Sequence, residues 1–130
     1  MNFVVIGVNH QTAPVEVREQ FAIPEARLPE AVKSLAEQPG VHEAMIVSTC
    51  NRVEWIACTE DGTDLNGFLR EFYHFDPAPL RQNLYEYHAT EAIRHIFRVA
   101  SSLDSMVVGE PQILGQVKEA YATARAVGAV

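Results

Sequence analysis

The sequence predicts one α+β domain with a ferredoxin-like β-α-β-β-α-β antiparallel sheet, followed by C-terminal helices. Three observations indicate this fold: a length of 130 residues, four short apolar or β-branched runs, and amphipathic helical patterns between and after them. The hydrophobic content of 48% and charged content of 21% are ordinary for a globular domain. We expect residues 1–88 to form the ferredoxin-like part and residues 89–130 the helical part.

The first half of the sequence predicts a strand, then helices, then a pair of strands. Phe3 to Val8 is an apolar strand pattern, and Pro14 starts a short helical turn. Glu25 to Glu37 has apolar residues at helical spacing and stops at a Pro-Gly pair. Ala44 to Val47 and Val53 to Cys58 predict paired strands around a polar turn.

The second half adds a helix, a strand and two more helices. Leu65 to Phe75 predicts a helix and Leu84 to Tyr87 a short strand. Thr90 is a suitable N-cap for a helix that runs to Ala100. A last helix opens at Glu110-Pro111, because proline is tolerated in the first turn. Its apolar stripe consists of Ile113, Val117, Ala120, Tyr121 and Ala124.

The composition limits location and partners. Neither a signal peptide nor a membrane-spanning segment is recognisable, so we expect a soluble protein without a membrane partner. Two cysteines without an export signal favour reduced thiols in a cytoplasmic protein. The net charge of −7 argues against a strong grip on a phosphate backbone by this domain alone. Because the last helix ends without a partner for its stripe, we expect the chain to be part of something longer.

The strongest local feature is the polar turn Ser48-Thr49-Cys50-Asn51-Arg52. A nearby guanidinium favours the nucleophilic thiolate of Cys50, and free backbone N–H groups of a turn can stabilise an oxyanion. The alternative is a buried cysteine in a tight turn, with Arg52 merely solvated. Cys58 lies inside an apolar run and is more simply a core residue.

The remaining candidates are a histidine and a helix start. His95 falls at the edge of an apolar helix face, where a half-buried imidazole could act as a general base, or simply be a hydrogen-bonded histidine. Gln112 and Gln116 lie one turn apart near a helix N-terminus, which favours an anionic ligand, or they belong to an exposed amphipathic helix. No metal-ligand spacing occurs, so we expect no metal. Without a glycine-rich phosphate loop, any nucleotide cofactor must bind elsewhere.

Three segments together closely resemble the glutamyl-tRNA reductase family: Gly7 to Pro14, Ser48 to Glu54, and His95 to Lys118. The resemblance implies NADPH-dependent reduction of glutamyl-tRNA(Glu) to glutamate-1-semialdehyde through a Cys50 thioester, the first step of five-carbon tetrapyrrole (porphyrin, haem) biosynthesis in the cytoplasm. It also implies that only the N-terminal catalytic domain is present, without the NADPH-binding domain and the dimerisation domain that makes the full enzyme a homodimer. The downstream aminomutase is a possible further partner.

The family's site residues carry over by position. Cys50 would be the nucleophile and His95 the histidine important for activity and proton transfer. The residues expected to contact substrate are Thr49, Cys50, Asn51, Arg52, Ser105, Glu110, Pro111, Gln112 and Gln116. One departure is Ser102, where many members are expected to have glycine. If that glycine has a positive φ, serine strains the turn slightly.

Two other readings stay open. In the first, the chain is a stand-alone cysteine-dependent hydrolase that uses Cys50 and His95 and needs no reductant. In the second, it is a non-catalytic ferredoxin-like binding module in which Cys50 is only a turn residue. Unselective reactivity of Cys50 and Cys58 would support the binding module.

Overall fold

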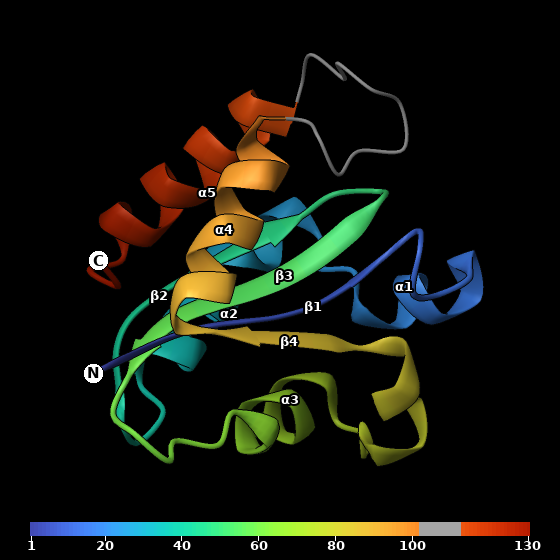
Figure 1. Cartoon of the computed structure of the whole chain (residues 1–130), viewed down its shortest axis with the longest axis horizontal. Coiled ribbons are helices and arrows are strands. Elements are labelled where there is room, and N and C mark those ends of the chain that lie inside the picture. Colours follow the sequence, from blue (N-terminus) through green and yellow to red (C-terminus); the bar gives the residue numbers. More distant parts are fainter. Residues whose placement is uncertain (102–112) are drawn as a thin grey trace.

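The core of the molecule is a four-stranded antiparallel sheet, seen in a computed structural model that describes residues 1–101 and 113–130. Its strands are β1 (Asn2–Asn9), β2 (Val41–Ser48), β3 (Arg52–Thr59) and β4 (Tyr85–His88), in the spatial order β2-β3-β1-β4. Helices connect β1 to β2 and β3 to β4 (Figure 1). The predicted α+β, ferredoxin-like β-α-β-β-α-β fold is confirmed.

The helices agree with the predicted patterns, apart from their ends. They are α1 (Val15–Phe21), the 3-10 helix η1 (Glu25–Arg27), α2 (Leu28–Ala36), α3 (Asn66–Tyr73), the 3-10 helix η2 (Ala78–Asn83), α4 (Ala89–Ala100) and α5 (Ile113–Ala126). The prediction that Thr90 caps a helix was wrong, because α4 begins at Ala89 and its N-cap is His88. The predicted start of the last helix at Glu110-Pro111 lies outside the described residues.

The two faces of the sheet are both covered, because side chains alternate across each strand. On one face Val4, Ile6 and Trp55 join residues of α2 and α3 in the larger apolar cluster. On the other face Val5 and Ile56 pack with residues of α4 and α5. Figure 1 shows α4 in front of the sheet and α2 behind it, and α5 packs beside the edge strand β2. Polar side chains of β3 that point toward α4 are therefore removed from water.

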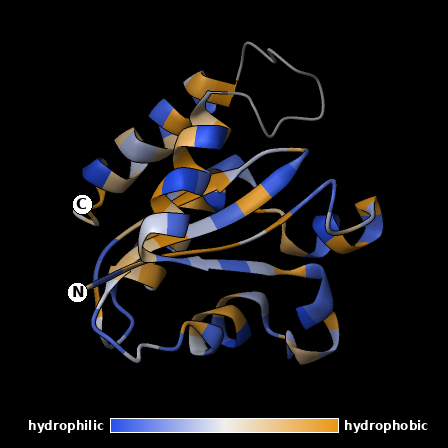
Figure 2. Cartoon of the chain, in the orientation of Figure 1, coloured by the Kyte–Doolittle hydropathy of each residue, from blue (hydrophilic) through white to orange (hydrophobic). Residues whose placement is uncertain are grey.

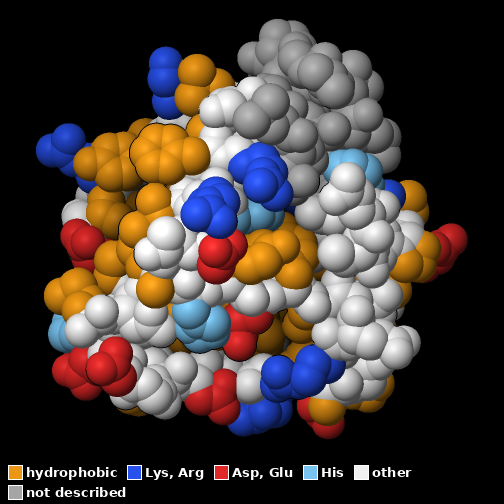
Figure 3. Space-filling view, viewed as in Figure 1, with side chains coloured by type: hydrophobic (Ala, Val, Ile, Leu, Met, Phe, Trp, Pro, Cys, Tyr) orange, Lys and Arg blue, Asp and Glu red, His pale blue; other side chains and the backbone are white. Residues whose placement is uncertain are grey.

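The helices carry mixed surfaces, and hydrophobic and hydrophilic residues alternate along them in Figure 2. On the outer side of α4 and α5, however, four large apolar side chains are exposed: Ile93, Phe97, Leu114 and Tyr121. Orange side chains gather over this part of the surface in Figure 3. Among the described helices, none combines the length and the apolar character that crossing a membrane requires.

Candidate active site

The turn between β2 and β3 is shaped by the hydroxyl of Thr49. Its Oγ1 atom accepts hydrogen bonds from the backbone N–H groups of Asn51 and Arg52, each at 3.2 Å. The Thr49 N–H donates to the carbonyl oxygen of Arg52 at 2.8 Å. Short hydroxyl side chains often stabilise turns in this way. The tip of the turn, Cys50, is thereby held at the end of the sheet.

Cys50 is exposed, whereas Arg52 is only 1% exposed. The alternative of a buried cysteine beside a solvated arginine is therefore wrong for both residues. The expectation of free turn amides also needs correction, because Thr49 already takes the N–H groups of Asn51 and Arg52. Within the part of the chain that the structure describes, the Cys50 N–H has no hydrogen-bond acceptor.

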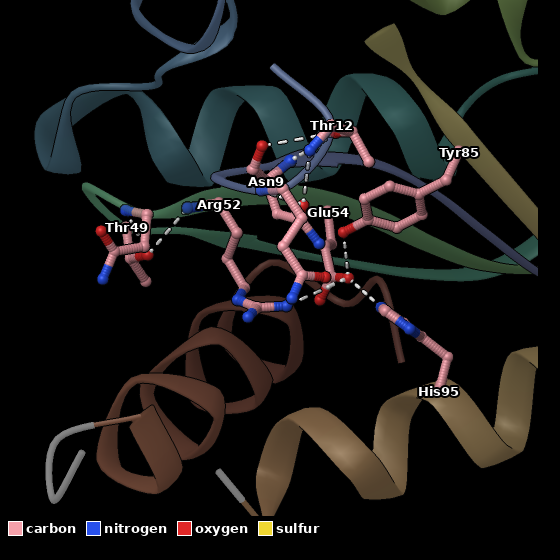
Figure 4. A network of polar contacts seen from close by, with 9 residues as sticks. Asn9, Thr12, Thr49, Arg52, Glu54, Tyr85 and His95 are labelled. Carbon is pink, nitrogen blue, oxygen red and sulfur yellow. Dashed lines mark hydrogen bonds and ion pairs between the residues drawn. The ribbon is translucent and has the colours of Figure 1, made fainter. Parts of the chain in front are cut away.

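A second loop, after β1, lies against the cysteine turn. The Asn9 side chain accepts hydrogen bonds from the N–H groups of Gln11 and Thr12, at 2.9 and 3.1 Å. The backbone N–H of His10 donates to the carbonyl oxygen of Asn51 at 3.1 Å. Figure 4 shows Asn9 and Thr12 beside the strand that carries Arg52 and Glu54. Two of the three segments that resemble the reductase family thus form one end of the sheet.

Arg52 and Glu54 form an ion pair on the face of β3 that α4 covers. The Nη1 atom of Arg52 lies 3.8 Å from Oε2 of Glu54, and each side chain is only 1% exposed. Charges removed from water interact strongly, but they are costly to bury without partners. Glu54 was not singled out from the sequence. The sequence did contain a clue, because Glu54 lies within a predicted strand whose neighbouring residues are apolar. A glutamate buried in such a strand nearly always has a partner.

His95 of α4 completes this buried group, which we call the Glu54 cluster: Arg52, Glu54, Tyr85 and His95. The Nε2 atom of His95 contacts Oε2 of Glu54, and the Tyr85 hydroxyl donates to the same oxygen at 2.5 Å (Figure 4). The His95 ring also packs against the rings of Tyr85 and Tyr87, with centroids 5.1 and 4.8 Å away. The expected half-buried histidine is in fact buried, at 6% exposure.

Cys50 is not part of this cluster. Glu54, the partner of His95, follows Cys50 by four residues, and four residues of extended strand span about 13 Å, so the chain between Cys50 and Glu54 reaches at most that far. No hydrogen bond between Cys50 and His95 occurs among the described residues. The role of His95 in proton transfer stays a prediction, and its observed contact is with Glu54.

A cavity of about 520 Å³ opens between α5 and the start of α2, and we call it the α2–α5 cavity. Ser48 and Gln116 line it, so it lies beside the strand end that leads to Cys50. Ser48 Oγ accepts a hydrogen bond from the Ile23 N–H at 3.2 Å. Among the described residues, the buried Oε1 atom of Gln116 has no hydrogen-bond partner. Four other expected substrate contacts, Ser105, Glu110, Pro111 and Gln112, and the departure at Ser102 lie outside the described residues.

The second cysteine belongs to a different surface. Cys58 is half-buried, so its prediction as a core residue was only partly right, and it lines a hollow of about 310 Å³ with Phe3 and Tyr121. Burial raises the pKa of the Cys58 thiol, and the charge of Glu43 raises it further. A thiol with a raised pKa is a poor nucleophile at neutral pH. This contrast favours Cys50 as the reactive cysteine.

Comparisons with known proteins agree with these features. The family model for the glutamyl-tRNA(Glu) reductase N-terminal domain matches residues 6–130. Over the whole chain, identity is 74% to glutamyl-tRNA reductase 2 of Koribacter versatilis (strain Ellin345), 30% of which is covered, and 51% to glutamyl-tRNA reductase of Solibacter usitatus (strain Ellin6076), 32% of which is covered. The solved glutamyl-tRNA reductase from Methanopyrus kandleri superposes with a TM-score of 0.74 at 33% identity, over 98% of this chain and 29% of that one. The chain spans about a third of the length of these relatives, and it belongs to the glutamyl-tRNA reductase N-terminal domain family.

Proposed function

We propose that this chain carries the substrate-binding and thioester-forming part of a glutamyl-tRNA reductase, with Cys50 as nucleophile. The observation that carries the proposal is an exposed thiol on a hydrogen-bonded turn, two residues before a buried arginine ion pair. The relatives that it matches are named as reductases of glutamyl-tRNA. A nucleophile and a cation at this spacing suit attack on an acyl group that bears a carboxylate.

The proposed step is a transesterification. The Cys50 sulfur attacks the carbonyl carbon of the glutamyl ester, a sulfur–carbon bond forms, and the bond from that carbon to the ribose oxygen breaks. The thiol proton ends on the released ribose hydroxyl. The Cys50 N–H is the proposed donor to the oxyanion of the tetrahedral intermediate.

Arg52 is the proposed partner of the glutamyl side-chain carboxylate, because a guanidinium matches a planar carboxylate in a forked geometry. The contact of Arg52 with Glu54 is made through the Nη1 atom. Because Arg52 is only 1% exposed, this pairing requires the surrounding chain to open when substrate enters. We propose that His95 and Tyr85 act as positioning residues, which hold Glu54 and thereby the guanidinium. Direct proton transfer by His95 would instead give a pH-dependent acylation rate that His95→Asn flattens.

The reduction is assigned to the rest of the full-length relatives. Dinucleotide sites usually use a glycine-rich turn between a strand and a helix of a parallel sheet. The described sheet is antiparallel, so these residues do not fit NADPH, and we derive no step through it.

We further propose that the unmatched part of the relatives binds NADPH and forms the homodimer. In this chain, we propose substrate contacts for Thr49, Asn51, Gln116 and the residues at 105 and 110–112. An interaction with the downstream aminomutase and a cytoplasmic location remain proposals.

The deciding experiment is incubation of the chain with glutamyl-tRNA carrying labelled glutamate, followed by acid quench and intact-protein mass spectrometry. A glutamyl adduct on the wild type that is absent from Cys50→Ser supports the proposal, and Cys58→Ser is the matched control that keeps the adduct. Release of glutamate by Cys50→Ser at the wild-type rate would show that Cys50 is not the nucleophile. Without a reductant, we expect only slow hydrolysis of the thioester.

A further inference from the structure

We propose that the outer side of α4 and α5 docks an amphipathic helix of another protein, apolar along one side and acidic on its flanks. The surface, which we call the α4–α5 face, consists of four apolar side chains and the basic side chains beside them. The apolar members are Ile93, Phe97, Leu114 and Tyr121. The inference goes beyond the proposed function, because no step of the thioester chemistry uses these side chains.

The apolar part of this face lies on two neighbouring helices. Ile93 and Phe97 are four residues apart and share one side of α4. Leu114 and Tyr121 are seven residues apart and share one side of α5. Phe97 is 69% exposed, and the other three are close to half exposed. A single exposed apolar side chain is ordinary, whereas a group on adjacent helices is typical of a binding surface.

A hollow extends the face between α5 and the sheet. This Cys58 hollow has a volume of about 310 Å³ and a mainly apolar lining that includes Phe3, Met45 and Tyr121. Ile56 also lines it and belongs to the apolar cluster that α4 and α5 cover. Because ligand pockets usually enclose roughly 300–1,000 Å³, the hollow suits one inserted anchor side chain better than a large ligand. Protein interfaces often depend on such anchors.

Positive charges border the apolar side chains. On α5, Lys118 and Arg125 lie three and four residues from Tyr121, on the same side of the helix. On α4, Arg98 follows Phe97. All three cations are exposed, and none forms an ion pair within residues 1–101 and 113–130. The two helices together have four basic and two acidic residues, although the whole chain has a net charge of −7. Acidic side chains of a partner would complement this local charge.

Three other occupants fit these features less well. A second copy of this chain would place the same cations against each other in a two-fold interface. An RNA strand or an anionic membrane would match the cations, but the carboxylate of Glu43 lines the hollow and repels phosphate. A membrane surface would also leave the hollow unfilled, and Ile93 and Leu114 offer no ring for a base to stack on. A helix that lays its apolar side into a groove fits both the hollow and the cations.

The test uses two helical peptides of about four turns that share one apolar stripe of Leu and Phe at positions i, i+3, i+4 and i+7. One peptide has Glu on both flanks of the stripe, and the other has Lys. In calorimetry at low salt, we expect the Glu peptide to bind at least about tenfold more tightly than the Lys peptide. Added salt should reduce this difference, because it screens exposed charges.

Two sets of variants locate the binding. Phe97→Glu should abolish it, whereas Val15→Glu, at an exposed valine of α1, is the matched control that should preserve it. Lys118→Glu combined with Arg125→Glu should remove the preference for the Glu peptide. Arg70→Glu, at an exposed arginine of α3, is the control for charge and should leave the preference unchanged.

Equal affinity of the two peptides, or no binding of either, would overturn the inference, and so would binding that survives Phe97→Glu. Each rival occupant also has a contrary result. Self-association that Phe97→Glu removes in analytical ultracentrifugation would show a second copy. Tighter binding to vesicles of anionic phospholipid would show a membrane surface, and displacement of the Glu peptide by tRNA would show RNA. Peptide binding that is absent from a full-length reductase of the family would show that the rest of the enzyme covers the face.

Discussion

The carboxylate of Glu54 on β3 contacts the Nε2 atom of His95 on α4, although 41 residues separate the two in the sequence. The same carboxylate oxygen accepts a hydrogen bond from Tyr85 and pairs with Arg52. One buried oxygen thus joins the helix to two strands and holds the arginine behind the cysteine turn. The Glu54 cluster is for this reason both a structural element and a candidate part of the site.

Removing the carboxylate should destabilise the fold strongly. Glu54→Ala removes the carboxylate that lies beside the buried Arg52 guanidinium, and we expect the free energy of unfolding to fall by about 3 kcal/mol. The matched control is Glu91→Ala on α4, which removes a carboxylate from the exposed pair with Arg94 and should cost less than about 1 kcal/mol. Urea unfolding measures both values. Similar losses for the two variants would mean that the ion pair with Arg52 contributes little.

Gly7 of β1 lies directly beneath the Tyr85 ring. A Cβ atom at this position would approach the Tyr85 hydroxyl oxygen to 2.6 Å, so Gly7→Ala must displace the ring from Glu54. We expect a loss of about 1–3 kcal/mol in unfolding free energy from this overpacking. Gly67→Ala in α3 is the control, because its Cβ would have only a 3.7 Å contact with Gln38, and it should stabilise by about 0.5–1 kcal/mol. A neutral Gly7→Ala in thermal unfolding would contradict the described position of Tyr85.

The sequence was sufficient to predict the helices, the strands and the position of the cysteine turn. It was not sufficient to predict the side-chain contacts that join these elements. Strand periodicity and the polar stretch from Ser48 to Arg52 predicted the β2–β3 pair and Cys50 at its turn. The partner of His95 could not be predicted, because the pairing depends on how α4 crosses the sheet. The burial of Arg52 was also missed, since local sequence does not reveal which face of β3 a helix covers. Ser48 and Gln116 meet at one cavity only after α5 has packed beside β2.

The two cysteines should react differently with alkylating agents. Burial raises the pKa of Cys58, so a smaller fraction of it is thiolate at pH 8 than for an ordinary thiol. We expect iodoacetamide to modify the exposed Cys50 first in the folded protein, and both cysteines alike in urea. Above about pH 10, where an ordinary thiol is almost fully thiolate, Cys58 should keep gaining reactivity. Peptide mass spectrometry follows both sites, and equal rates in the folded protein would favour the binding-module reading.

Tyr73 gives a prediction about stability in alkaline solution. Its hydroxyl donates to the carbonyl oxygen of Phe21 at 2.6 Å, and burial raises its pKa well above the ordinary value. Tyr73→Phe leaves that carbonyl without this donor and should cost about 1–2 kcal/mol at pH 8.

Above pH 10 this advantage of the wild type should shrink. The tyrosine of the unfolded chain ionises near pH 10, whereas the folded one keeps its proton, so the raised pKa contributes stability below about pH 10 that is lost as the pH rises further. Tyr73→Phe lacks this loss, and its deficit relative to wild type in urea unfolding should narrow between pH 8 and 11. The half-exposed Tyr121→Phe serves as control and should stay within about 0.5 kcal/mol of wild type at pH 8. A deficit for Tyr73→Phe that does not change with pH would mean that the Tyr73 phenol ionises as readily in the folded protein as in the unfolded chain. That result would contradict the raised pKa of Tyr73.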